Sequence, residues 1–200
     1  METGNPDAFP AGIFFGGYPE ARYVVSGNTV ITNHPNADAM DAVGFDVSEG
    51  TRGAMITNNH IVMHSVIPTS GGVALVGAVD NSIVSSNTIE GTNGSAIQIL
   101  GFDNATVADS NKALGNNISQ ESALVADIVF GPFSTNNLVA GQCATYVDQG
   151  IGNRITCGTA INTLANVTRA ALGPRHRFDV RRMDDVHRAN LDATHQGLTR

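Results

Sequence analysis

The stretches Val25-Ser-Gly-Asn-Thr-Val30, Ile56-Thr-Asn-Asn-His-Ile61 and Val84-Ser-Ser-Asn-Thr-Ile89 repeat one short pattern. Each begins and ends with an aliphatic residue and has an asparagine at its fourth position. Read outward from that asparagine, the pattern recurs six times, with anchors at Asn28, Asn59, Asn87, Asn111, Gln142 and Thr159. The spacing between anchors varies while the spacing within a copy does not. This is typical of a solenoid with fixed strands and variable loops.

Short runs in each copy alternate apolar and polar residues, as in Phe45-Asp46-Val47 and Ile97-Gln98-Ile99. Period two predicts strands, and the abundance of Val, Ile and Thr agrees with that assignment. We therefore expect an all-β fold, a parallel β-helix of about six coils with three short strands in each. Because asparagine tolerates the left-handed backbone conformation and its amide can bond the next coil, about 4.8 Å away, we expect one column to form a ladder. Its predicted members are Asn28, Asn59, Asn87 and Asn111.

The three quoted stretches resemble the repeats of right-handed parallel β-helix proteins of the pectate-lyase-like superfamily. The resemblance covers roughly residues 13 to 162. It implies a right-handed, single-stranded solenoid and, for function, a link with polysaccharides. Catalytic residues are added to such a scaffold separately, so the repeat itself specifies no reaction.

Three segments follow from the pattern: a lead-in at 1–12, the β-helix at 13–168 and an Arg-rich tail at 169–200. In the tail, Val180, Met183 and Val186 recur at three-residue spacing, which fits a short helix over the last coil. A disordered tail is the competing interpretation. The repeat begins abruptly near Phe14 without a capping helix, so the chain is also readable as a fragment of a longer β-helix.

The net charge of −7 is distributed unevenly. Residues 1–168 contain fourteen acidic residues and four basic ones, whereas the remaining residues carry seven arginines and four aspartates. An acidic body argues against nucleic acid as a partner. It also weighs against electrostatic capture of polyuronates, so a neutral glycan, or an acidic one bridged by Ca²⁺, is the better expectation. No cofactor other than such a calcium ion is expected.

No apolar run is long enough to span a membrane, and the first twenty residues show no signal peptide. An extracellular or cell-envelope location is nevertheless expected from the resemblance. The two cysteines, Cys143 and Cys157, fall near one corner of adjacent predicted coils. They are either a disulfide closing the C-terminal coil or two small buried side chains.

Candidate catalytic residues lie in the loops that follow the anchors. His34 and His64 are predicted at one corner, one coil apart, with Asp38 and Asp41 in the first loop, 31–44. Histidine beside carboxylate is suited to proton transfer or to holding a metal ion. The plainer interpretation is a solvated loop surface. Asn93, Asn116 and Glu121 continue this row on later coils.

A second predicted row faces outward from a strand and comprises Asp46, Ala74, Gln98 and Val129. Asp46 and Gln98, with Asn93 and Asn116 from the loop row, are the candidate substrate-binding residues. The run Gly44-Phe45-Asp46-Val47-Ser48-Glu49 resembles part of the Gly-Phe-Asp-Pro-His-Glu signature of alginate epimerases but lacks its Pro and His. The triplet Gly101-Phe102-Asp103 recurs in a different register relative to its anchor, which reduces the weight of the motif.

These observations favour a polysaccharide-binding or structural β-helix module without a complete catalytic motif. One alternative is a fragment of a polysaccharide lyase, uronate epimerase or glycoside hydrolase. Another is an oligomeric spike or adhesin stem, in which the apolar side chains of Val76, Leu100 and Val129 would be contact surface. The sequence fixes neither the glycan nor the oligomeric state.

Overall fold

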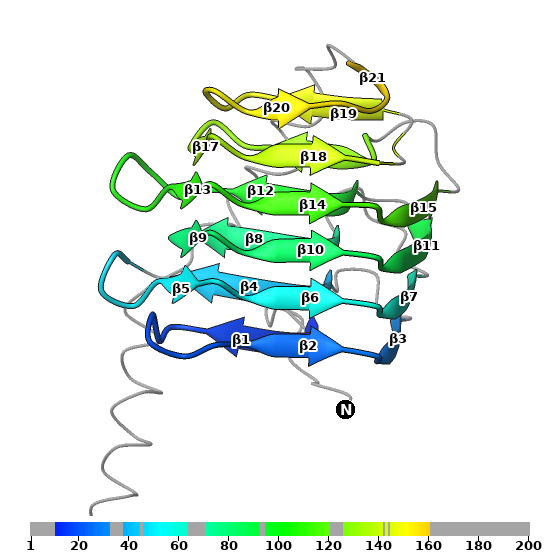
Figure 1. Ribbon diagram of the computed structural model, residues 1–200, viewed down its shortest axis with the longest axis horizontal. Helices are drawn as coiled ribbons and strands as arrows, with labels where there is room; N and C mark the ends of the chain where they lie inside the picture. Colours follow the sequence, from blue (N-terminus) through cyan, green and yellow to red (C-terminus); the bar gives the residue numbers. More distant parts are fainter. Residues whose placement is uncertain are drawn as a thin grey trace, which may run out of the picture.

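The computed structural model describes residues 11–32, 38–44, 46–63, 71–92, 95–120, 126–141, 143 and 145–160, and the strands within them form four parallel sheets. Successive strands along the chain belong to successive sheets, so each sheet collects one strand from each coil (Figure 1). In Figure 1 the chain runs to the right along the front sheet, returns to the left behind it and rises at each pass, which makes the coil right-handed.

Sheet A consists of β1 (Ala11–Gly16), β4 (Asp38–Gly44), β8 (Gly71–Gly77), β12 (Ser95–Leu100), β16 (Ile128–Phe130), β19 (Thr145–Asp148) and β21 (Thr159–Ala160). Sheet B consists of β2 (Val24–Ser26), β6 (Met55–Thr57), β10 (Ile83–Ser85), β14 (Lys112–Leu114), β18 (Leu138–Ala140) and β20 (Arg154–Ile155). Sheet C consists of β3 (Thr29–Thr32), β7 (His60–Met63), β11 (Thr88–Thr92) and β15 (Asn117–Gln120). Sheet D consists of β5 (Thr51–Arg52), β9 (Val79–Asp80), β13 (Ala108–Asp109) and β17 (Ser134–Thr135).

This arrangement confirms the predicted all-β parallel solenoid. Sheet B stacks six strands, as six coils require, but sheets C and D stack four each, so about four turns are built in full. The middle turns have four strands where three were predicted, because the two-residue strands of sheet D precede those of sheet B. The Arg-rich tail at 169–200 lies outside the described residues.

The core fills the inside of the coil with columns of aliphatic side chains. One column follows the register of sheet A through Ile13, Met40, Val73, Ile97, Ile128 and Tyr146. Its four middle members are fully or almost fully buried. Burying such a side chain stabilises a fold by about 1.5–3 kcal/mol, so the core supplies the main driving force for coiling.

Counting fourteen residues back from each anchor predicts that Phe14 and Phe45 begin this column. That prediction is wrong for the first two coils, where Ile13 and Met40 face the core. The prediction assumed a constant distance from strand to anchor. That distance varies, because loops separate sheet A from sheet D after β4 and β12, and Figure 1 shows them projecting at the left edge. The predicted loop at 31–44 is likewise mostly strand: β3 extends to Thr32, and β4 contains Asp38 and Asp41.

A residue with positive φ lies at each end of most sheet B strands and turns the chain through a sharp corner. Before the strands these are Gly53, Asn81, Ser110, Asn136 and Gly152, and after them Gly27, Asn58, Ser86, Gly115 and Gly141. Non-glycine residues adopt this conformation at a cost, and asparagine does so most readily. At most of these corners the residue that follows the turn hydrogen-bonds to a neighbouring coil through its side chain.

Side chains after the second turn form the first asparagine ladder: Asn28, Asn59, Asn87 and Asn116. Each interior member receives bonds on its Oδ1 from the backbone N and Nδ2 of the preceding one. Its own Nδ2 also donates back to a carbonyl of the preceding coil, as Asn87 Nδ2 does to Ile56 O at 2.9 Å. The prediction is confirmed for Asn28, Asn59 and Asn87.

Asn111 does not belong to this ladder. It lies five residues before Asn116, on the other side of sheet B, in a second ladder of Ser82, Asn111, Asn137 and Asn153. Here each backbone N donates to the side-chain oxygen of the next member. Two ladders therefore flank sheet B on the inside of its two corners and keep successive coils in register.

Candidate functional site

The predicted catalytic residues are only partly within the described structure. His34 and His64 lie outside the described residues. The strands that precede them, β3 and β7, are paired in register through Thr32 and Met63. Asp38 belongs to β4 but its side chain is not described, and Asp41 lies further along the same strand with 8% of its surface exposed. Glu121 and Asn93 lie outside the described residues.

The remaining predicted substrate-binding residues lie apart from one another. Asp46 is exposed in the loop before β5, Gln98 is buried in β12 at 7% exposure, and Asn116 is a buried member of the first ladder. The row through Gln98 contains Asp41 and not Asp46. Asp46 was predicted in this row because counting back from the anchor did not allow for the loop between β4 and β5, as for Phe45.

Asp46 Oδ1 accepts hydrogen bonds from Ser48 N and Ser48 Oγ, both at 2.6 Å, and from Glu49 N at 2.7 Å. The Ser48 hydroxyl bond and the Glu49 amide bond lower the pKa of Asp46 below its ordinary value. This is the geometry of an Asx turn, in which the carboxylate closes the loop that carries it. One oxygen of Asp46 is thus committed to loop structure.

Asp103 does the same in the loop after β12, where its Oδ1 accepts from Ala105 N, Thr106 N and Thr106 Oγ1. Because Val76 pairs with both Val43 and Leu100, the glycines of the two Gly-Phe-Asp triplets, Gly44 and Gly101, occupy equivalent positions at the end of the sheet A strands. The different register assigned to them came from the misplaced Asn111 anchor.

The glycine of each triplet is fixed by close packing. A Cβ on Gly44 would lie 2.1 Å from Ala78 O, and one on Gly101 would lie 2.2 Å from Phe133 O. The backbone of the next coil therefore leaves no room for a side chain there. Together with the capping aspartates, this makes the triplet a recurring loop-forming unit.

The outward row of sheet A is buried along most of its length. Its members Asp41, Ala74, Gln98, Val129 and Val147 are each exposed by 8% or less. Val129 also belongs to a small cluster with Ala126, Val147 and Leu100. Its expected role as exposed contact surface of a spike stem is therefore wrong. Among the described residues this row therefore offers no open strip for a ligand from β4 to β19, although Phe14, which continues it on β1, is 49% exposed.

The outer face of sheet C is open. Two rows cross its four strands in register: Thr29, His60, Thr88 and Asn117, and beside them Ile31, Val62, Glu90 and Ser119. All eight side chains are exposed or half-buried, whereas the residues between them, such as Ile61 and Ile89, face the core. The face thus presents hydroxyl, amide, imidazole and carboxylate groups at outward positions that repeat from coil to coil, next to a short apolar strip. The predicted loop row begins where these strands end.

Two titratable side chains meet on the described part of this face. His60 Nε2 lies 3.4 Å from Glu90 Oε1, and both side chains are about half exposed, at 48% and 47%. The residues are diagonal neighbours on adjacent strands, a position from which long side chains meet. A pair this exposed contributes little to stability, so both groups remain available to a ligand.

A second polar row follows sheet D through Arg52, Asp80, Asp109 and Thr135. Burial, reinforced by the neighbouring charge of Asp109, raises the pKa of Asp80. For Asp109 burial acts in the same direction, but hydrogen bonds from Thr135 Oγ1, Ser110 Oγ and Asn136 Nδ2 outweigh it and lower the pKa. The pKa values of these two neighbouring carboxylates are therefore shifted in opposite directions.

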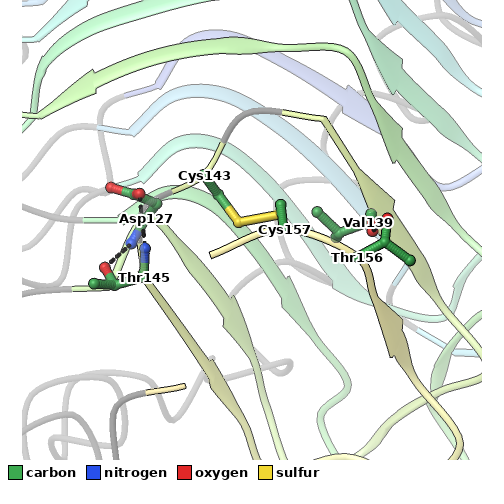
Figure 2. Close-up of a disulfide and its surroundings, with 6 residues drawn as sticks. All are labelled: Asp127, Val139, Cys143, Thr145, Thr156 and Cys157. Atoms are coloured by element: carbon green, nitrogen blue, oxygen red, sulfur yellow. Dashed lines mark hydrogen bonds between the residues drawn. A yellow bond between two sulfur atoms is a disulfide. The ribbon is translucent and has the colours of Figure 1, made fainter. Parts of the chain in front are cut away.

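The last coil is closed by a disulfide between Cys143 and Cys157, whose Cα atoms are 5.5 Å apart (Figure 2). Around it, Thr145 N donates to Asp127 Oδ2 at 3.1 Å, and Thr156 N donates to Val139 O at 2.9 Å. Both cysteines also pack against the main core. Of the two interpretations of the cysteines, the disulfide is the one observed.

Within the described ranges, no group of three or more His, Cys, Asp or Glu side chains is arranged to hold a metal ion. The same part of the chain contains no helix long and apolar enough to cross a membrane. Searches against protein-family models, curated proteins and solved structures returned no match for this chain. The fold and the surface chemistry therefore carry the functional argument.

Proposed function

We propose that this chain is a carbohydrate-binding β-helix module whose glycan lies along the solenoid axis on the outer face of sheet C. The observation that carries the proposal is the pair of open rows on that face, one polar throughout and the other half apolar. Their side chains repeat at the coil spacing of about 4.8 Å, which is close to the length of one sugar in an extended polysaccharide. A polymer of similar units would therefore meet two outward side chains at each coil.

The chemistry of the face also suits sugars. Thr29, Thr88, Asn117 and Ser119 provide neutral donors and acceptors for hydroxyl groups, while Ile31 and Val62 provide apolar contact for the ring faces. Ligand sites generally combine apolar lining with a few placed polar groups. A shallow, solvated face of this kind predicts weak binding that gains strength along a long polymer.

The disulfide supports an extracellular or cell-envelope location. Disulfides form and persist in oxidising compartments and are rare in the cytosol. Such a location would place the module where polysaccharides are found, in agreement with the proposed ligand.

The test is a panel of neutral and uronic polysaccharides, with and without Ca²⁺, measured for binding by calorimetry and for product formation. Thr88→Ala and Asn117→Ala remove groups from the face. Ser85→Ala, three residues from Thr88 and half-buried on sheet B, is the matched control. We expect each sheet C variant to weaken binding several-fold and the control to leave it unchanged. Equal losses in all three variants, or no binding by any member of the panel, would contradict the proposal.

A second candidate is hydrolase chemistry, favoured by the opposite pKa shifts of Asp80 and Asp109. Carboxylates whose environments separate their acidities are suited to act as acid and base. Turnover of any polysaccharide, lost in both Asp80→Asn and Asp109→Asn while the fold is retained, would support it. The loops containing His34 and His64 would be the next place to look if turnover survived both changes.

A further inference from the structure

The charges of the two open faces differ in sign. The strands of sheet C contain no lysine or arginine, and Glu90 is their one acidic residue. Sheet B, by contrast, begins two of its strands with exposed cations, Lys112 and Arg154, which share an outward column with Leu138. The first asparagine ladder marks the corner between the faces. The net charge of the chain does not reveal that its positive and negative side chains are separated between these two faces.

Glu90 is central on its face. Its strand, β11, lies between β7 and β15, and its row neighbours are Val62 and Ser119. A polymer that follows either of the two rows of sheet C over three or four coils therefore passes within a few ångströms of this carboxylate, because neighbouring strands lie only about 4.8 Å apart. The imidazole of His60 approaches this carboxylate from the side of β7, with Nε2 3.4 Å from Oε1.

We infer that Glu90 determines specificity by disfavouring glycans that carry carboxylate groups, so that the site on sheet C accepts neutral glycans. This inference rests on the proposed function and adds the substrate class. The physical cause is repulsion between like charges brought side by side. The acidic body of the chain, which holds ten more acidic than basic residues through position 168, adds to it at low ionic strength.

The magnitude follows from Coulomb's law. Two unit charges about 4 Å apart in a watery environment interact by about 1 kcal/mol, which corresponds to roughly fivefold in affinity. Removing the charge of Glu90 should thus improve binding of a carboxylated glycan about fivefold at low salt, and less at about 0.5 M salt. Binding of a neutral glycan should not respond to the charge.

The experiment uses one glycan backbone in two charge states, oligogalacturonate and its fully methyl-esterified form, titrated into the whole chain at pH 8 with chelator present. Wild type, Glu90→Gln and Glu49→Gln are compared. Glu49 is an exposed carboxylate in the loop before β5, so its substitution changes the net charge equally but away from sheet C. We expect the wild type to bind the ester more tightly than the acid. Glu90→Gln alone should remove most of this difference in affinity.

An equal gain in Glu49→Gln would show a global charge effect and overturn the inference. So would a wild-type preference for the acidic form that disappears in Lys112→Ala, because the ligand would then lie on sheet B. In both cases ester binding that still depends on Thr88 and Asn117 would leave the proposed function intact. Failure of either form to bind any variant would overturn the proposed function and this inference together.

Discussion

Replacing Asn87 by alanine tests whether the first asparagine ladder holds the coils together. The Asn87 side chain makes four hydrogen bonds: Oδ1 accepts from Asn59 N and Nδ2, and Nδ2 donates to Ile56 O and Asn116 Oδ1, all at 2.9 Å. The residue is 1% exposed, so water cannot replace these partners.

At a net contribution of about 1 kcal/mol for each bond, the loss is about 4 kcal/mol, and the orphaned amide of Asn59 adds to it. This is a large part of the 5–15 kcal/mol typical of a folded domain. Asn28→Ala is the matched control. Its Nδ2 makes two bonds at the exposed end of the ladder, so we expect a loss of about 1 kcal/mol.

Urea unfolding followed by far-UV circular dichroism measures the difference in the free energy of unfolding. Hydrogen exchange at the amide of Asn59 reports on the same change locally, because that donor loses its partner. Asn87→Asp, which keeps the size of the side chain but loses both donations, separates hydrogen bonding from packing. A loss below about 1 kcal/mol in Asn87→Ala, or a stable Asn87→Asp, would refute the reasoning.

Three further predictions concern a turn, a carboxylate and the disulfide. Ser86 has a φ of 56° and an exposed side chain, so Ser86→Gly should relieve strain and raise the free energy of unfolding by up to about 1 kcal/mol; a loss would show that the hydroxyl stabilises the turn. The pKa of Asp80 is raised in the folded state, so the stability associated with its protonated form is present below the unfolded pKa and is lost as pH rises through the folded pKa. Asp80→Asn should therefore be more stable than the wild type at pH 7 and similar to it at pH 3. The reverse order of stabilities would contradict the pKa shift. Reducing the bond between Cys143 and Cys157, which are 14 residues apart, should cost about 3 kcal/mol, with increased hydrogen exchange confined to β19–β21; uniform exchange throughout the solenoid would contradict a local role.

The general form of the fold was readable in the sequence because its physical causes are local. Alternating Val and Ile with asparagine at a fixed offset specify strand, corner and ladder within each window, and Asn28, Asn59 and Asn87 were correctly aligned on that basis. Asn116 could have been aligned as well. Lys112-Ala-Leu-Gly-Asn-Asn-Ile118 has the same arrangement as Met55-Ile-Thr-Asn-Asn-His-Ile61, and Asn111 was preferred because the presence of two ladders five residues apart was not foreseen.

The candidate site was less predictable, because loop length and exposure are not local properties. In coils two and four the loop between sheets A and D displaces the strand of sheet A relative to the anchor, so Asp46 was aligned with Gln98 where Asp41 belongs. Its role in closing that loop depends on amides that only the folded turn brings to its carboxylate.

The sequence by itself determined that the chain coils, what its corners are made of and which residues fill its core in coils three to five, since each follows from periodicity within a few neighbouring residues. Only the tertiary structure decided which surface is open. The rows of sheets A and C both alternate in sequence, yet Gln98 is buried and Thr88 is not, and Lys112 is separated from Glu90 by a corner. Burial and the grouping of charges depend on which coils lie side by side, and that depends on loop lengths that no local pattern encodes.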